Sequence, residues 1–323
     1  MKRKIAAAAS MFIILFFAGG AAAEGRLLYM RWVGDYLYAF TSDSGGKNEK
    51  RLFKCIDADI SGDSKKIAYT VTSDSEGGSR EIAVYDVLSG KSRILKNIPP
   101  VHNMAPKWSH DCAFLLFAHF REDNGDLCFG IYDIEKDRVK VMFKEALSPL
   151  GKNVKTEGLF APFWSLDGQY VYANDFKYLY KFSVSAGKQE EVIPLADICP
   201  KGFEMDASAK FSFLEDGSLL FSVQIADEDC RICKSLVSSS HKRGAFIYFP
   251  NEKRTVRIFT DDYCVENIID GAHGDFYIAA HKKDGKFPKS TLNTGDLYKI
   301  SDSGKRAELI IIKANNPSFA KQK

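Results

Sequence analysis

The sequence has almost no excess charge of either sign. Its 323 residues include 45 Lys and Arg and 42 Asp and Glu, and three of the basic residues, Lys2, Arg3 and Lys4, lie at the start of the chain. The rest of the chain is therefore close to neutral. Because proteins that bind nucleic acid or an anionic membrane surface concentrate basic residues on one face, we expect neither of these partners.

Long apolar runs are missing except at the N-terminus. Residues 5–18 are apolar, follow the basic residues, and precede a small-residue segment that ends at Ala23. This pattern predicts a signal peptide over residues 1–23, cleaved so that the mature chain starts at Glu24. The alternative is an uncleaved anchor helix, but the run is shorter than the roughly 20 residues that span a bilayer. We therefore expect a periplasmic or secreted monomer with no transmembrane segment after cleavage.

Motifs for catalysis and metal binding are also missing. There is no Gly-x-Ser-x-Gly sequence, and the six histidines do not pair at ligand spacing. Residues 57–63 resemble the start of a calcium loop, but Ala68 replaces the acidic residue required at its twelfth position. We favour a β-hairpin for this segment, and we expect no catalytic residue, no cofactor and no metal.

Helical periodicity is absent after the N-terminal run, whereas internal repetition is clear. Each copy of the repeat has a short strand that ends in an apolar residue, a turn of Ser, Asp and Gly, and a second apolar strand. The clear copies are residues 161–172, 105–116, 58–69 and 211–221, and the degenerate copies are residues 31–38 and 269–278.

Further strands follow each copy and give about four strands per unit of roughly 50 residues, which is typical of β-propeller blades. We expect an all-β propeller of four-stranded antiparallel blades over residues 24–312, with six blades favoured and five or seven left open. The first unit is short, so it is either abbreviated or shares strands with residues 308–312, and such sharing would close the ring. Residues 313–323 are polar and are expected to form a loose tail.

The copies resemble the TolB-type, or WD40-like, propeller repeat, whose signature is roughly Pro-x-Trp-Ser-Pro-Asp-Gly. Residues 162–168 match it except at Leu166, and residues 106–111 match less completely. The resemblance implies the propeller fold. We expect no counterpart of the α/β domain that precedes the propeller in TolB-type proteins, because the first repeat starts soon after the predicted cleavage point. We assign structural roles to the repeat residues Trp32, Ser61, Asp63, Trp108, Ser109, Asp111, Trp164, Ser165, Asp167, Gly168, Asp216 and Gly217.

Two of these residues, Trp108 and Trp164, could instead stack on a sugar or a peptide. Their shared position in the repeat favours packing between blades.

The seven cysteines leave at least one thiol without an intramolecular partner. Cys230 and Cys233 are the only two cysteines that lie close together in the sequence. Disulfides can form in the oxidising compartments that an exported protein enters. A loop disulfide or buried thiols are the favoured interpretation. A metal site with His241, Cys199 or Cys264, and a redox role, remain open alternatives.

Function is less constrained than fold, because one fold hosts many functions. The long insertions at residues 226–243 and 281–294 could shape a partner surface. We expect a non-enzymatic propeller that binds a protein or peptide partner in the cell envelope, on its rim or at its central channel. One alternative is a propeller hydrolase or lyase for sugars or lactones with its active site in that channel. A structural envelope component is a third.

Overall fold

The regular secondary structure of the described residues is almost entirely β-strand. The computed structural model describes residues 25–72, 78–99, 102–121, 125–147, 156, 158–206, 209–225, 243–258, 263–271, 275–282, 295–301 and 306–320. Within these ranges there is one short 3-10 helix, η1 (Leu195–Asp197). No helix in the described ranges has the length and apolar character needed to cross a membrane.

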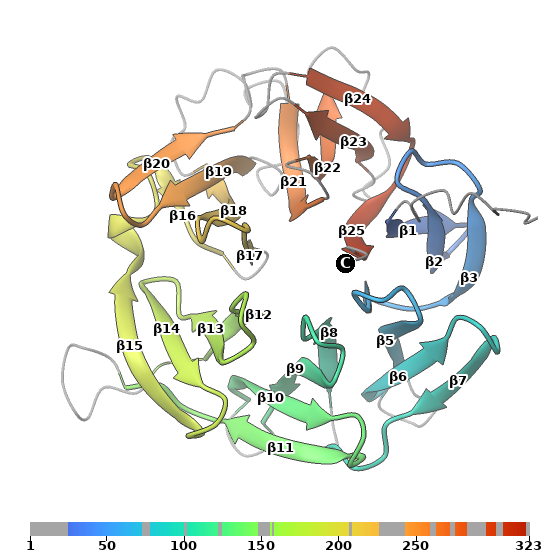
Figure 1. Cartoon of the computed structure of the whole chain (residues 1–323), viewed down its shortest axis with the longest axis horizontal. Helices are drawn as coiled ribbons and strands as arrows, with labels where there is room; N and C mark the ends of the chain where they lie inside the picture. The colour runs from blue at the N-terminus through green and yellow to red at the C-terminus, as the bar shows by residue number, and fades with distance from the viewer. Residues whose placement is uncertain are drawn as a thin grey trace, which may run out of the picture.

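Six antiparallel sheets surround a central axis and form a six-bladed propeller (Figure 1). This arrangement confirms the predicted fold class and the favoured blade count. Blade one contains β25 (Asn315–Ala320), β1 (Arg26–Val33), β2 (Tyr36–Asp43) and β3 (Lys50–Lys54). Blade two contains β4 (Ala58–Ile60), β5 (Lys66–Thr72), β6 (Arg80–Asp86) and β7 (Lys91–Ile94). Blade three contains β8 (Asn103–Trp108), β9 (Phe114–Phe120), β10 (Leu127–Asp133) and β11 (Arg138–Phe143).

The other three blades follow in chain order around the ring, with β12 (Phe160–Trp164), β17 (Lys210–Phe213) and β21 (Tyr263–Asp270) nearest the axis (Figure 1). Blade four contains β12 (Phe160–Trp164), β13 (Tyr170–Asn174), β14 (Tyr178–Ser183) and β15 (Lys188–Pro194). Blade five contains β16 (Phe203–Glu204) and β17 (Lys210–Phe213), which both pair with β18 (Leu219–Ile225), then β19 (Arg243–Phe249) and β20 (Arg254–Arg257). Blade six contains β21 (Tyr263–Asp270), β22 (Phe276–Lys282), β23 (Asp296–Ser301) and β24 (Arg306–Ile311).

The ring closes through the C-terminal strand. Of the two alternatives for the short first unit, the structure shows a shared blade, but the shared strand is β25, which pairs antiparallel with β1. Residues 308–312 instead belong largely to β24, the outermost strand of blade six. The loose tail predicted for residues 313–323 is therefore wrong over β25, where Pro317, Ser318 and Ala320 are buried.

Trp32 also lies at a different position from the one that the repeat assigned to it. It is half-buried on β1, the second strand of blade one, whereas Trp108 and Trp164 end the innermost strands of their blades. The described chain begins at the second strand of blade one, and its C-terminus supplies the innermost strand. The equivalent of Trp108 in blade one is therefore Phe319.

The Ser-x-Asp turns link the innermost strand of a blade to the second strand. The hydroxyl groups of Ser61, Ser109 and Ser165 donate to the carboxylates two residues later, over 2.7, 2.6 and 2.6 Å. Each hydroxyl oxygen also accepts from the backbone N–H five residues later, at 2.9 Å. In blade five, Ser218 donates to Asp216 at 2.5 Å. Gly168 and Gly217 adopt left-handed φ angles of 68° and 82°, which glycine tolerates readily.

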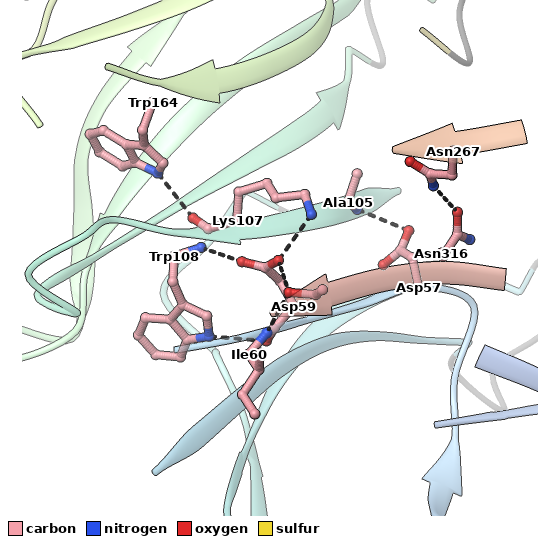
Figure 2. Close-up of polar contacts among 10 residues, drawn as sticks. Asp57, Asp59, Ile60, Ala105, Lys107, Trp108, Trp164, Asn267 and Asn316 are labelled. Atoms are coloured by element: carbon pink, nitrogen blue, oxygen red, sulfur yellow. Dashed lines mark hydrogen bonds and ion pairs between the residues drawn. The ribbon is translucent and has the colours of Figure 1, made fainter. Parts of the chain in front are cut away.

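Indole rings connect adjacent blades. Trp108 Nε1 donates to the carbonyl of Asp59 at 3.2 Å, and Trp164 Nε1 donates to the carbonyl of Lys107 at 3.1 Å (Figure 2). Both side chains are buried, with exposed fractions of 6% and 5%. These tryptophans therefore pack and hydrogen-bond between the innermost strands of neighbouring blades.

Replacing Trp164 with Phe should lower the free energy of unfolding by about 1–3 kcal/mol, because the Lys107 carbonyl loses a donor and the ring loses volume. Urea unfolding followed by circular dichroism measures this loss. Trp32→Phe is the matched control, since among the described residues no hydrogen bond of the Trp32 indole joins two blades, and its effect should be smaller. An equal loss in both variants would contradict the inter-blade role.

Candidate functional site

The innermost strands define two faces of the ring. All six begin at one face, which we call the top face, and the Ser-x-Asp turns follow their other ends at the bottom face. Because neighbouring strands are antiparallel, the second strand of each blade returns to the top face. The turn between the second and third strands, such as the turn between β13 and β14, therefore also lies at the top.

One position near the start of each innermost strand forms a ring around the axis. It lies three residues before the position of Trp108 and Trp164, and we call it the axial ring. Moving from blade one to blade six, it is occupied by Asn316, Asp57, Ala105, Ala161, Lys210 and Asn267.

The backbone at this position is irregular in several blades. Ala105, Ala161 and Asn316 have left-handed φ angles of 52°, 48° and 45°, which are uncommon for residues other than glycine. The strand register shifts at the same point in blades one, three, four and six. A bulge of this kind changes the direction in which a side chain points. The axial ring therefore coincides with a backbone irregularity that recurs in the innermost strands.

Asp57 carries the negative charge of the axial ring. Its carboxylate accepts from the hydroxyl of Thr70 at 2.5 Å and from the backbone N–H of Ala105 at 3.1 Å. Burial raises the pKa of Asp57, and the Thr70 hydrogen bond and the positive charge of Lys210 offset part of that rise. Lys210 lies three blades away, so the two charges face each other across the axis.

Asn267 has an unsatisfied buried atom. Its exposed fraction is 6%, and its Nδ2 donates to Asn316 Oδ1 at 2.9 Å. Its Oδ1 has no hydrogen-bond partner. In Figure 2 this atom points in the direction of Ala105. A buried acceptor without a donor is costly and rare, so this atom is suited to a donor from outside the protein.

Asp59 lies on β4, two residues after Asp57, and has a different role. Its carboxylate accepts from Lys107 Nζ at 2.9 Å, from the Trp108 N–H at 2.9 Å and from Ser318 Oγ at 2.7 Å (Figure 2). Ser318 also accepts from the Ile60 N–H at 3.2 Å. This cluster joins blades one, two and three, so Asp59 holds the ring together at its point of closure.

The repeat residues singled out in the sequence lie away from the axial ring, at the bottom turns or between blades. Asp57 was considered only as part of a calcium loop, and Lys210, Asn267 and Asn316 were missed. Aligning the copies and reading three positions back from the residue equivalent to Trp108 gives Asp57, Lys210 and Asn267, and adding the closing strand gives Asn316. Within the described ranges, no cluster of three or more His, Cys, Asp or Glu could hold a metal ion.

Cys230 and Cys233 lie outside the described residues, as do nearly all residues of the two long insertions. Among the described residues, Cys55, Cys112 and Cys199 are free thiols. Burial raises the pKa of Cys199 to about 11, and a thiol is nucleophilic only as the thiolate. Only a small fraction of Cys199 is therefore thiolate near neutral pH, which makes it a weak nucleophile.

Exposed apolar side chains are unevenly distributed between the two faces. Among the described residues, the exposed large aromatics are Tyr36, Phe120 and Phe176, and all three lie at the top face, at or beside the ends of second strands. Val33 and Ile312 are exposed at the same face, whereas the bottom turns expose Leu88 and Leu166. Phe176 stacks on Phe160 with ring centroids 4.4 Å apart, and Lys54 Nζ lies 3.3 Å from the centroid of Tyr36.

Solved structures share this fold. A chain of the nidogen/laminin complex has a TM-score of 0.59 at 8% identity, covering 93% of this chain and 100% of that chain. Two putative 6-phosphogluconolactonases are also similar. The one from Bacteroides uniformis has a TM-score of 0.52 at 12% identity and covers 92% of this chain and 99% of its own. The one from Bacteroides fragilis has a TM-score of 0.50 at 10% identity and covers 93% and 99%.

Identities this low show the fold alone. No protein-family model matches the chain, and no curated protein matches it.

Proposed function

We propose that the protein is an exported, non-enzymatic β-propeller, similar to TolB-type repeat proteins, that binds a protein or peptide partner in the cell envelope through its top face. Export rests on the N-terminal sequence, which has the basic, apolar and small-residue segments of a signal peptide. The similarity to TolB-type proteins rests on the repeat residues around Trp108 and Trp164.

The observation that supports partner binding is the placement of Tyr36, Phe120 and Phe176 on one face. Aromatic side chains are enriched at protein interfaces, because they bury a large area at a small cost in conformational entropy. The carboxylate of Asp59 is meanwhile occupied by three donors that hold the fold. The described polar groups nearest the ring closure thus serve structure, while the exposed aromatics leave part of each ring accessible to a partner.

Cross-linking of the exported protein in its own cells, followed by mass spectrometry, tests this proposal. The wild type should capture a protein partner, and the triple variant Tyr36→Ser, Phe120→Ser and Phe176→Ser should lose at least about 10-fold of the captured amount, since each interface aromatic contributes about 1–2 kcal/mol or more. The bottom-face variant Leu88→Ser and Leu166→Ser is the control and should retain capture. Equal capture by the two variants would contradict a top-face interface.

A further inference from the structure

The unsatisfied Asn267 Oδ1 is the first of three features of the axial ring that point to a small ligand. The amide is fixed, because its Nδ2 is already engaged with Asn316. Only an incoming donor can therefore satisfy the Oδ1 atom, which is buried and without a partner. An ammonium or N–H group is the chemistry that fits.

The second feature is the placement of opposite charges. Asp57 belongs to blade two and Lys210 to blade five, on opposite sides of the ring, and the charge of Lys210 acts on Asp57. The axial ring is thus formally neutral, and the Asp59–Lys107 pair beneath it is neutral too. A ligand with a net charge would face repulsion from one side, whereas a zwitterion finds an opposite charge on each side.

The third feature is the pair of alanines at the axial-ring positions of blades three and four. Ala105 and Ala161 present only a methyl group there, while the other four blades supply polar or charged side chains. The ring is therefore apolar on one side and polar on the others. A ligand with an apolar substituent would place that substituent beside the alanines.

We propose that the axial ring binds a zwitterionic α-amino acid. Its ammonium group donates to Asn267 Oδ1 and to the Asp57 carboxylate, and its carboxylate accepts from Lys210. A lysine ammonium has three donors, so Lys210 can bind the ligand and keep a contact within the protein. This site goes beyond the proposed partner interface and does not depend on it.

Isothermal titration calorimetry of the mature protein tests the proposal with three probes that share one side chain. L-leucine carries both charges, L-leucinamide carries only the ammonium, and N-acetyl-L-leucine carries only the carboxylate. We expect L-leucine to bind and each of the other two to bind about 10- to 100-fold more weakly, because each loses a charge-assisted hydrogen bond. Leucinamide binding as tightly as leucine, or no heat from any probe, would overturn the proposal.

Variants of Asp57 and Lys210 test whether these two residues bind the charged groups of the ligand. Asp57→Asn and Lys210→Met should each weaken L-leucine binding about 10- to 100-fold, while the exposed matched controls Glu190→Gln and Lys188→Met should leave it unchanged. Thermal melting of each variant checks folding, and Lys210→Met keeps the test open if Asp57→Asn does not fold. Unchanged binding in a folded Lys210→Met protein would overturn the assignment. Partner capture by Phe120 and Phe176 would stand in either case, so the two proposals fail separately.

Discussion

Deleting residues 315–323 should abolish the cooperative unfolding transition or lower the melting temperature by at least roughly 10 °C. The deletion removes β25, so β1 becomes an exposed inner edge of blade one. It also removes the stacking of Phe319 on Tyr277, whose ring centroids lie 5.0 Å apart, and the Ser318 hydroxyl that donates to Asp59. Contacts to blades two and six are therefore lost together with the strand pairing.

Differential scanning calorimetry measures this effect, and deletion of residues 321–323 alone is the control. The short deletion leaves β25 complete and should melt within a few degrees of the wild type. A nine-residue deletion that melted like the control would show that the ring does not depend on its C-terminal strand.

Replacing Asp59 with Ala should lower the free energy of unfolding by about 3–5 kcal/mol. The substitution leaves the buried N–H of Trp108 and the hydroxyl of Ser318 without their acceptor. Lys107 loses its ion pair as well, but its side chain is partly exposed and can turn toward water, so its share of the loss is small. Breaking contacts from two neighbouring blades at once explains why this effect exceeds that of Trp164→Phe.

Chemical denaturation of Asp59→Ala beside Glu190→Ala, an exposed carboxylate on β15, gives the comparison. Adding Ser318→Ala to Asp59→Ala should cost less than the same change in the wild type, because the two side chains interact. Strictly additive losses would mean that the Asp59–Ser318 hydrogen bond contributes little to ring closure.

The sequence predicted the blades well because their turns repeat. Ser109 with Asp111 and Ser165 with Asp167 form the same hydrogen bonds in successive blades, so one physical solution recurs in one sequence pattern. The closing strand was missed because the residues 316–319, Asn-Pro-Ser-Phe, keep only the proline and an aromatic residue of that pattern. Its polar composition suggested a tail, whereas Ser318 is buried and paired with Asp59.

The axial ring could not be predicted from repetition, since its six residues differ from blade to blade. Asp57 and Lys210 are far apart in sequence and meet across the axis only once the ring is closed. The asymmetry of exposed aromatics is likewise invisible in sequence, because Phe120 and Phe176 look the same there as the buried Phe117 and Phe129. Both features depend on which face and which side of a strand a residue occupies.

Site-specific photo-cross-linking in the exporting cells tests most directly the claim that this propeller binds a partner through its top face. A photoreactive amino acid would replace one residue at a time, at Tyr36, Phe120 and Phe176 on the top face and at Leu88 and Leu166 on the bottom face. We predict that the top-face positions form a cross-linked adduct with one protein partner and that the bottom-face positions form none. Adducts confined to Leu88 and Leu166, or no adduct at any of the five positions in the folded, exported protein, would contradict it.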